Sequence, residues 1–135
     1  MDLTPSRDES LIGRATLFVD HGLIMIEDPA SSYLHDGWDP ASEYVSAGPD
    51  SVYLSVQPSV DGPVEIGIFT SESGRADGVL YFGGSISVKS GGIVIHDADD
   101  VMRFTVRKTK GKVRIKVLVD EAGLASQMRV VFLAE

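Results

Sequence analysis

The sequence contains no cysteine. This absence excludes disulfide bonds, zinc sites built on thiolates and a cysteine nucleophile. Long apolar runs are also missing, because stretches such as Gly22–Ile26 are far shorter than the roughly 20 residues of a membrane-spanning helix. The first ten residues, MDLTPSRDES, lack the basic and apolar regions of a signal peptide. We therefore expect a protein of the reducing cytoplasm that does not contact membranes.

Signatures of catalysis and cofactor binding are missing as well. The chain has no HExxH pair, no nucleophile elbow and no glycine-rich phosphate loop that opens a helix. The paired glycines Gly83–Gly84 and Gly91–Gly92 lie between alternating segments and indicate turns. We therefore expect no cofactor and no catalytic residue.

The three histidines, His21, His35 and His96, each have an aspartate as a direct neighbour. Adjacent residues of a strand point to opposite faces, so this adjacency does not make a catalytic dyad. Histidines from distant strands of an all-β fold can converge on a metal. No pair of ligands has a recognisable spacing, however, and we expect no metal site.

Helical periodicity is absent over any useful length. The chain instead alternates apolar and polar residues in short segments, such as Ser51–Gln57 and Val64–Thr70, separated by turns rich in glycine and proline. About eight to ten such strands predict an all-β fold, an antiparallel β-sandwich, with a closed small β-barrel as the alternative. We expect a single domain over residues 1–135 with a loose tail at residues 1–10. Residues Asp20–Gly22 fit either a tight turn or a bulge in one long strand.

Basic residues are scarce until late in the chain. Residues 1–102 hold 17 acidic and 4 basic side chains, whereas residues 103–116 hold 7 basic and no acidic ones. The net charge of the whole chain is −8. This acidity argues against direct binding of nucleic acid, for which a basic surface is needed.

The basic segment alternates on both sides of a turn at Thr109–Gly111, which predicts an antiparallel hairpin over Val101–Asp120. The side chains expected on its buried face are Phe104, Val106, Val113, Ile115 and Val117. The side chains expected on its outward cationic face are Arg103, Arg107, Lys112, Arg114 and Lys116. Like charges that face each other destabilise a sheet. We expect solvent and acidic neighbours to offset this repulsion, or an anionic partner, which includes a second copy of the chain.

The segment Glu27–Pro49 is the least regular part of the sequence and contains Trp38, the only tryptophan. A loop of this length is usually functional or contains a short helix. Asp39 as N-cap with Pro40 at the first position predicts one helical turn. We expect Trp38 and Tyr44 to close one end of the core, and the alternative is that they belong to a recognition loop.

The order of residues from Gly37 to Ile68 resembles the competence protein J family. The resemblance lies in a Trp after Asp-Gly, Tyr44-Val45-Ser46-Ala47, Asp50 and the strands SVYLSVQ and VEIGIFT. It continues through Ser85–Val117, with Gly91–His96 and VRIKVLV. The resemblance implies a cytosolic, immunity-type binding protein without catalysis, which inhibits a nuclease that cuts DNA as it enters the cell. No set of functional residues transfers with it.

Acidic residues are the candidates for contact with such a partner, because the substrate groove of a nuclease is basic. The candidate residues are Asp36, Trp38, Asp39, Glu43, Asp97, Asp99 and Asp100. The acids at 97–100 lack the spacing and the glycine of a calcium loop, so a solvated loop is expected there. The basic face is the alternative interface, and a homo-oligomer remains open. Two other classes also remain open: a module that binds a sugar or lipid, and a small β-fold enzyme that uses His and Asp residues.

Overall fold

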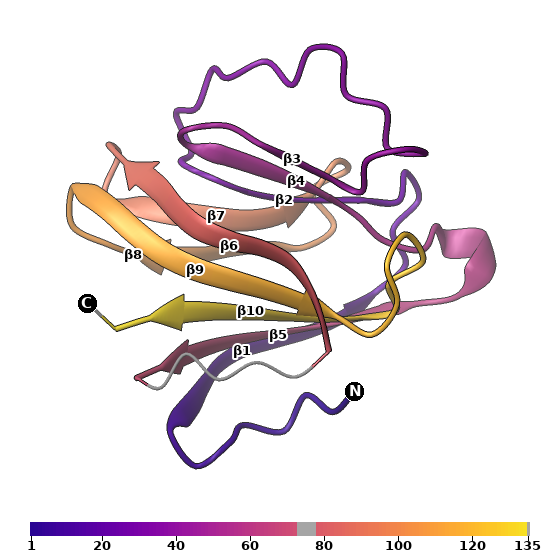
Figure 1. The fold of residues 1–135 in the computed structure, drawn as a ribbon, viewed down its shortest axis with the longest axis horizontal. Coiled ribbons are helices and arrows are strands. Elements are labelled where there is room, and N and C mark those ends of the chain that lie inside the picture. Colours follow the sequence, from indigo (N-terminus) through magenta and orange to yellow (C-terminus); the bar gives the residue numbers. More distant parts are fainter. Residues whose placement is uncertain (73–77, 135) are drawn as a thin grey trace.

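The structure is a computed structural model that describes residues 1–72 and 78–134. Figure 1 shows the chain folded into two β-sheets that lie face to face. The first sheet has the strand order β1-β5-β10-β9-β6. Its strands are β1 (Glu9–Leu17), β5 (Val64–Ser71), β6 (Val79–Val88), β9 (Gly111–Val119) and β10 (Gln127–Leu133). The second sheet has the strand order β3-β4-β2-β7-β8. Its strands are β2 (Leu23–Glu27), β3 (Val45–Ala47), β4 (Ser51–Ser55), β7 (Gly92–Asp97) and β8 (Arg103–Arg107).

Helix is nearly absent from the described residues, which contain one 3-10 turn, η1 (Ser59–Asp61). None of their helices is long and apolar enough to cross a membrane. Paired strands run antiparallel except for β5 and β10, which pair in parallel. The two sheets do not close into a barrel. The predicted antiparallel β-sandwich is therefore confirmed, and the closed-barrel alternative is wrong.

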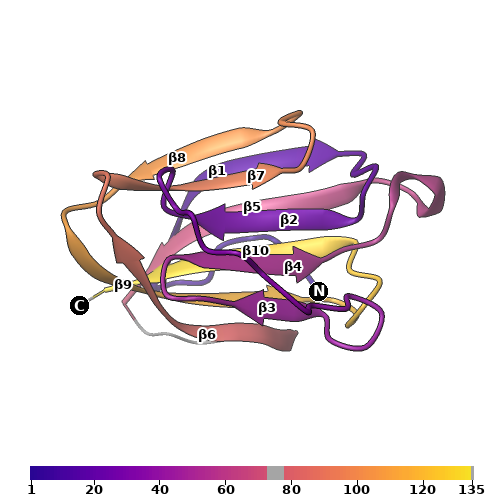
Figure 2. The ribbon, with the colours of Figure 1, turned by 90° about the horizontal axis from the view of Figure 1, so that it is seen from above.

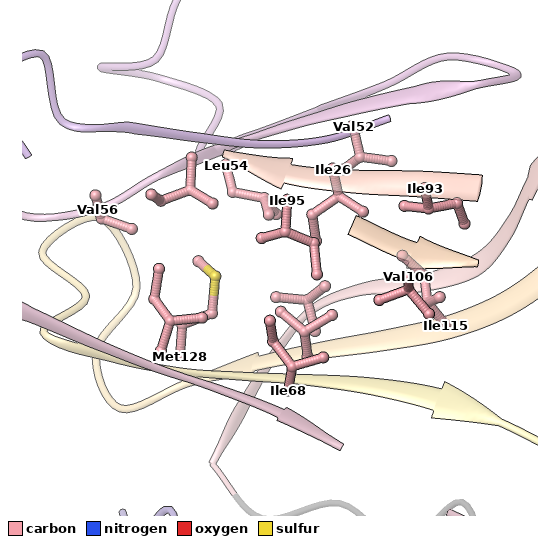
Figure 3. Packing of buried hydrophobic residues seen from close by; sticks show 14 of the residues in the cluster. Ile26, Val52, Leu54, Val56, Ile68, Ile93, Ile95, Val106, Ile115 and Met128 are labelled. Atoms are coloured by element: carbon pink, nitrogen blue, oxygen red, sulfur yellow. The ribbon is translucent and has the colours of Figure 1, made fainter. Parts of the chain in front are cut away.

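The core lies between the sheets and is built from aliphatic side chains of both, as Figure 3 shows. Ile26 and Ile95 point inward from the second sheet, and Ile68, Ile115 and Met128 point inward from the first. These side chains are almost completely shielded from solvent. Burial of one such side chain contributes roughly 1.5–3 kcal/mol, so this layer supplies most of the favourable free energy of folding.

The predicted basic hairpin does not form. Strand β8 pairs with β7 in the second sheet, whereas β9 pairs with β6 and β10 in the first. Residues 108–110 therefore carry the chain from one sheet to the other. The prediction failed because alternation determines which side chains point inward but does not identify the strand with which a segment pairs. The burial prediction is confirmed for Val106, Val113, Ile115 and Val117, and Phe104 is half-buried against the core.

This crossover divides the predicted cationic face into two parts. Arg103 and Arg107 point away from the core on the second sheet. Lys112, Arg114 and Lys116 point away from the core on the first sheet, on the opposite side of the sandwich. Lys112 and Arg114 are exposed and Lys116 is half-buried. A single cationic face is therefore a wrong prediction.

Residues Asp20–Gly22 form a tight turn rather than a bulge. The Gly22 N–H donates to the Val19 carbonyl over 3.2 Å, and Gly22 has a positive φ of 61°. The turn joins β1 in the first sheet to β2 in the second, so these strands are not one long bent strand. A bulge does occur, but it lies earlier, between Leu11 and Gly13 of β1.

The predicted loose tail is instead packed on the outer face of the first sheet. Leu3 is 1% exposed and contacts a small apolar cluster of Phe69, Leu118 and Val131. The Arg129 guanidinium donates to the carbonyl oxygens of residues 2 and 4 and pairs with the Glu9 carboxylate at 2.6 Å. The tail is ordered because the outward positions of three central strands are apolar and must be shielded from water.

One edge of the sandwich depends on a glycine. Figure 2 shows β8 above β1, and the Phe104 ring of β8 lies against Gly13 of β1. A Cβ atom at Gly13 would lie 2.5 Å from the nearest ring atom of Phe104. This distance is too short for a real contact, so the close approach of the two sheets requires a residue without a side chain here.

Gly13→Ala should lower the free energy of unfolding by about 1–3 kcal/mol, the usual cost of overpacking a core. Urea denaturation followed by circular dichroism measures the change. Gly83→Ala is the matched control, because a Cβ there meets no atom closer than 3.8 Å. Equal stability of the two variants would contradict the close packing of Phe104 on Gly13.

Candidate functional site

The segment between β2 and β3, residues 28–44, crosses the outer face of the second sheet (Figure 1), and we call it the covering loop. Its first residue, Asp28, is buried and accepts hydrogen bonds from the backbone N–H groups of Ala30, Lys89 and Ser90 at 2.6–3.0 Å. Burial alone raises the pKa of Asp28, but these hydrogen bonds outweigh it and the pKa lies below its ordinary value. The start of the covering loop is thus fixed to the turn that follows β6.

His35 holds the middle of the covering loop on the sheet. Its Nδ1 lies 2.7 Å from the Ser46 hydroxyl and its Nε2 lies 2.8 Å from the Ser51 hydroxyl. The imidazole also stacks on the Tyr53 ring with the centroids 3.7 Å apart, and the Tyr33 ring meets it edge-on. Burial lowers the pKa of His35, and the Glu27 carboxylate offsets this only in part. The neutral imidazole is therefore the form that fits this position.

Glu27 connects His35 to a second histidine. Its carboxylate accepts a hydrogen bond from the Ser51 hydroxyl at 2.8 Å and contacts Nε2 of His96 at 2.7 Å. Burial raises the pKa of Glu27, but the hydrogen bonds from His96 and Ser51 outweigh it and the pKa is lowered. The Asp100 carboxylate lies 3.4 Å from Nδ1 of His96, so the network reaches the turn between β7 and β8.

The contact between Ser51 and His35 does not have the geometry of a catalytic pair. The Ser51 hydroxyl donates its proton to Glu27, so Nε2 of His35 must donate to the Ser51 oxygen. A base that activates serine needs the opposite polarity, with the hydroxyl donating to the imidazole. Ser51 is also completely buried, which prevents its oxygen from reaching a substrate.

The aromatic residues of the covering loop lie outside the core. Trp38 is half-buried, donates its indole N–H to the Glu43 carbonyl at 2.7 Å and meets the Tyr53 ring edge-on. Tyr44 is exposed and stacks on Tyr81. The prediction that Trp38 and Tyr44 close one end of the core is therefore wrong, because both occupy the outside of the sandwich.

The predicted helical turn at Asp39 is confirmed. The Glu43 N–H donates to the Asp39 carbonyl at 2.9 Å, as in one turn of α-helix. The Asp39 carboxylate accepts a hydrogen bond from the Ala41 N–H at 3.0 Å, which is the N-cap interaction that the sequence predicts.

The structure separates the acidic candidates into two groups. Asp36, Asp39 and Glu43 are exposed on the covering loop. Asp99 and Asp100 lie in the turn between β7 and β8, where they pair with His21 and with Arg103, respectively. Asp97 is buried, and its carboxylate accepts a hydrogen bond from the Met102 N–H, so it holds this turn. The two groups lie on different parts of the surface and do not form one cluster.

The histidines do not converge. His21 lies with Asp99 at one end of the sandwich, whereas His35 and His96 contact Ser51 and Glu27 on the outer face of the second sheet. Within residues 1–72 and 78–134, no group of three or more His, Cys, Asp or Glu side chains is placed to hold a metal ion. The cationic candidates also remain apart, because β8 and β9 lie in different sheets.

Sequence reasoning missed the network itself. Glu27, Ser51 and His96 occupy outward positions of β2, β4 and β7, and they meet because Glu27 is opposite Ser51 in the register of the sheet. In the sequence, Glu27, Ser51 and His96 are marked only as polar residues within an apolar strand or at its end. The pairing of the strands is needed to bring them together.

Acidification should weaken the fold through His35. Its pKa is held below the ordinary value of 6.5, so the unfolded chain binds a proton first as the pH falls. The stability that neutral His35 contributes is complete above about pH 6.5 and declines as the pH falls toward the pKa of the folded state. Glu27, with a lowered pKa, acts in the same direction below its ordinary value of 4.5.

His35→Gln should therefore reduce the pH dependence of stability between about pH 7.5 and 5.5, and cost about 1–3 kcal/mol at the upper pH, where the hydroxyls of Ser46 and Ser51 lose their partner. Urea denaturation at several pH values measures both effects. His21→Gln is the control, because the His21 side chain is 65% exposed and has a single ion pair. An unchanged pH slope in His35→Gln would contradict the assigned role of His35.

Comparison with known proteins identifies solved structures with the same fold. No protein-family model and no curated protein matches the sequence. Among solved structures, the crystal structure of ComJ from Bacillus subtilis, described as an inhibitor of the DNA degrading activity of NucA, superimposes with a TM-score of 0.69 at 12% identity, over 94% of this chain and 98% of that one. A structure described as crocagin biosynthetic gene J superimposes with a TM-score of 0.57 at 14% identity, over the same shares of the two chains. The resemblance to the competence protein J family is therefore confirmed as a resemblance of fold.

Proposed function

We propose that this chain is a non-enzymatic binding protein that inhibits a nuclease in the cytoplasm. The observation that carries the proposal is the fold, which follows that of ComJ, an inhibitor of a DNA-degrading activity, over 94% of this chain. The orientation of the Ser51–His35 pair gives Ser51 no role as a nucleophile, since the imidazole donates to the hydroxyl.

The covering loop is suited to meeting a basic partner. Its exposed carboxylates, Asp36, Asp39 and Glu43, lie within five residues of the half-buried Trp38 in the sequence. A nuclease needs a basic groove to hold the phosphates of its substrate, and carboxylates on a rim attract such a groove from a distance. The loop is also held in one conformation by Asp28 and His35, so little conformational entropy is lost on binding.

A small-molecule site has less support. A hollow of about 260 Å³ lies at the end of the sandwich opposite the β7–β8 turn, and is lined by Asp8, Ser10, Glu72, Lys108 and Phe132, among others. Pockets for sugars or lipids are larger and are lined mainly by apolar and aromatic side chains. The mixture of opposite charges in this hollow fits solvent better than an apolar ligand.

The carboxylates of the covering loop should act mainly on association. Asp36→Asn combined with Glu43→Gln should slow the association with the nuclease about three- to tenfold and change the dissociation rate by less than about twofold, because rim charges steer encounter. Asp39 is left intact in this variant because its carboxylate caps the helical turn. Surface plasmon resonance against the small DNA nucleases encoded in the source genome, at low and physiological salt, gives both rates.

The matched control is Asp8→Asn combined with Glu72→Gln, which removes the same charge from two exposed residues at the opposite end of the sandwich. This control should associate like the unmodified chain. Equal slowing by both variants would show that only the net charge matters. Failure of the unmodified chain to bind or inhibit any of these nucleases would refute the proposed function.

A further inference from the structure

One end of the sandwich carries an unusual set of exposed apolar side chains. Four connections meet there, the β1–β2, β4–β5, β7–β8 and β9–β10 connections, and we call residues 18–22, 56–63, 98–102 and 120–126 the loop end (Figure 1). Each connection presents one large apolar side chain to solvent. These side chains and their exposed fractions are Phe18 at 60%, Val60 at 88%, Val101 at 69% and Leu124 at 50%.

Hydrogen bonds join the four connections into one surface. The Ser59 N–H donates to the Val19 carbonyl at 3.0 Å, which ties the β4–β5 connection to the β1–β2 turn. The Gln57 N–H donates to the Ala125 carbonyl at 3.0 Å, which ties it to the β9–β10 connection. His21 and Asp99, 3.3 Å apart, link the β1–β2 turn to the β7–β8 turn. The four connections that carry the apolar tips therefore lie side by side at this end of the sandwich.

The loop end is also fixed in shape. Each connection contains one residue with a positive φ: Gly22, Gly62, Asp100 and Gly123. Two aspartates hold the turns from within, Asp97 through the Met102 N–H and Asp120 through the N–H groups of residues 121, 126 and 127. Binding through preorganised tips loses little conformational entropy. Burial of such exposed apolar side chains against a partner contributes favourably to the free energy of binding.

Charge indicates the nature of that partner. The loop end holds six Asp and Glu residues and neither Lys nor Arg, and the adjoining Arg103 pairs with Asp100 at 3.3 Å. An acidic residue lies within three positions of each apolar tip, such as Asp61 after Val60 and Glu121 before Leu124. The opposite end of the sandwich carries both signs of charge, because Lys89, Lys108 and Lys110 lie there together with Asp8 and Glu72.

We propose that the loop end is the anchoring surface for a protein partner whose docking face has apolar recesses bordered by Lys and Arg. This inference rests on the proposed function, and the partner is then the inhibited nuclease. The four apolar side chains enter the recesses and determine the dissociation rate of the complex. The neighbouring carboxylates pair with the Lys and Arg residues at the border of the recesses. A second copy of the chain is a poor occupant, because two acidic ends repel each other.

Dissociation kinetics test the proposal. Phe18→Ser and Leu124→Ser should each accelerate dissociation from the nuclease about tenfold or more and change association by less than about twofold, because loss of a buried anchor acts mainly on dissociation. Both side chains are largely exposed, so the thermal unfolding temperature of each variant should stay close to that of the unmodified chain. The matched control is Leu11→Ser, a change of the same kind on β1, where Leu11 is 41% exposed and belongs to neither the loop end nor the covering loop.

Each outcome decides a separate point. Fast dissociation of the two loop-end variants with unchanged Leu11→Ser supports the loop end as the anchor. Dissociation of both loop-end variants at the rate of the unmodified chain overturns the inference and leaves the proposed function intact. Light scattering that shows a dimer of the unmodified chain and a monomer of the two loop-end variants also overturns it, since a second copy would then occupy the surface. Absence of any nuclease binding refutes the inference together with the proposed function.

Discussion

Burial of one face of every central strand between the two sheets is the constraint that positions the rest of the molecule. Because successive side chains of a strand leave on opposite faces, the inward positions of Ile24 and Ile26 place Glu27 outward on β2. The same rule places Ser51 outward on β4, opposite Glu27, and His96 outward on β7, opposite Met25 and diagonal to Glu27. The polar network under the covering loop is thus a consequence of the apolar layer on the other side of the sheet.

Buried polar groups are tolerated in this network because each has a partner. Asp28 and Glu27 would be costly to shield from water as isolated charges, but backbone N–H groups, a hydroxyl and an imidazole surround them. This arrangement gives the covering loop a fixed path over the sheet without contacts to the core. The fold that carries this loop is shared with ComJ at 12% identity.

The path of the chain between the sheets determines the distribution of charge. The basic residues 103–116 are divided by the crossover at residues 108–110, so two parts of one continuous segment face opposite sides of the sandwich. The acidic connections at the other end are gathered instead, although long stretches of sequence separate them. One end of the molecule becomes acidic and apolar, whereas the other carries both signs of charge, and the acidic end can orient the chain as it approaches a basic partner.

The sequence by itself determined the fold class, the inward side chains of the basic segment and the capped turn at Asp39, because alternation and capping depend on residues a few positions apart. Which strands pair, and in which sheet, was decided by tertiary structure. The expected hairpin between β8 and β9 failed for this reason, and so did the expected loose tail, since Leu3 is ordered only by apolar residues of three distant strands. The Glu27–Ser51–His96 contacts and the grouping of Phe18, Val60, Val101 and Leu124 likewise arise from register and topology, because local residue preferences carry no information about partners that lie far away along the chain.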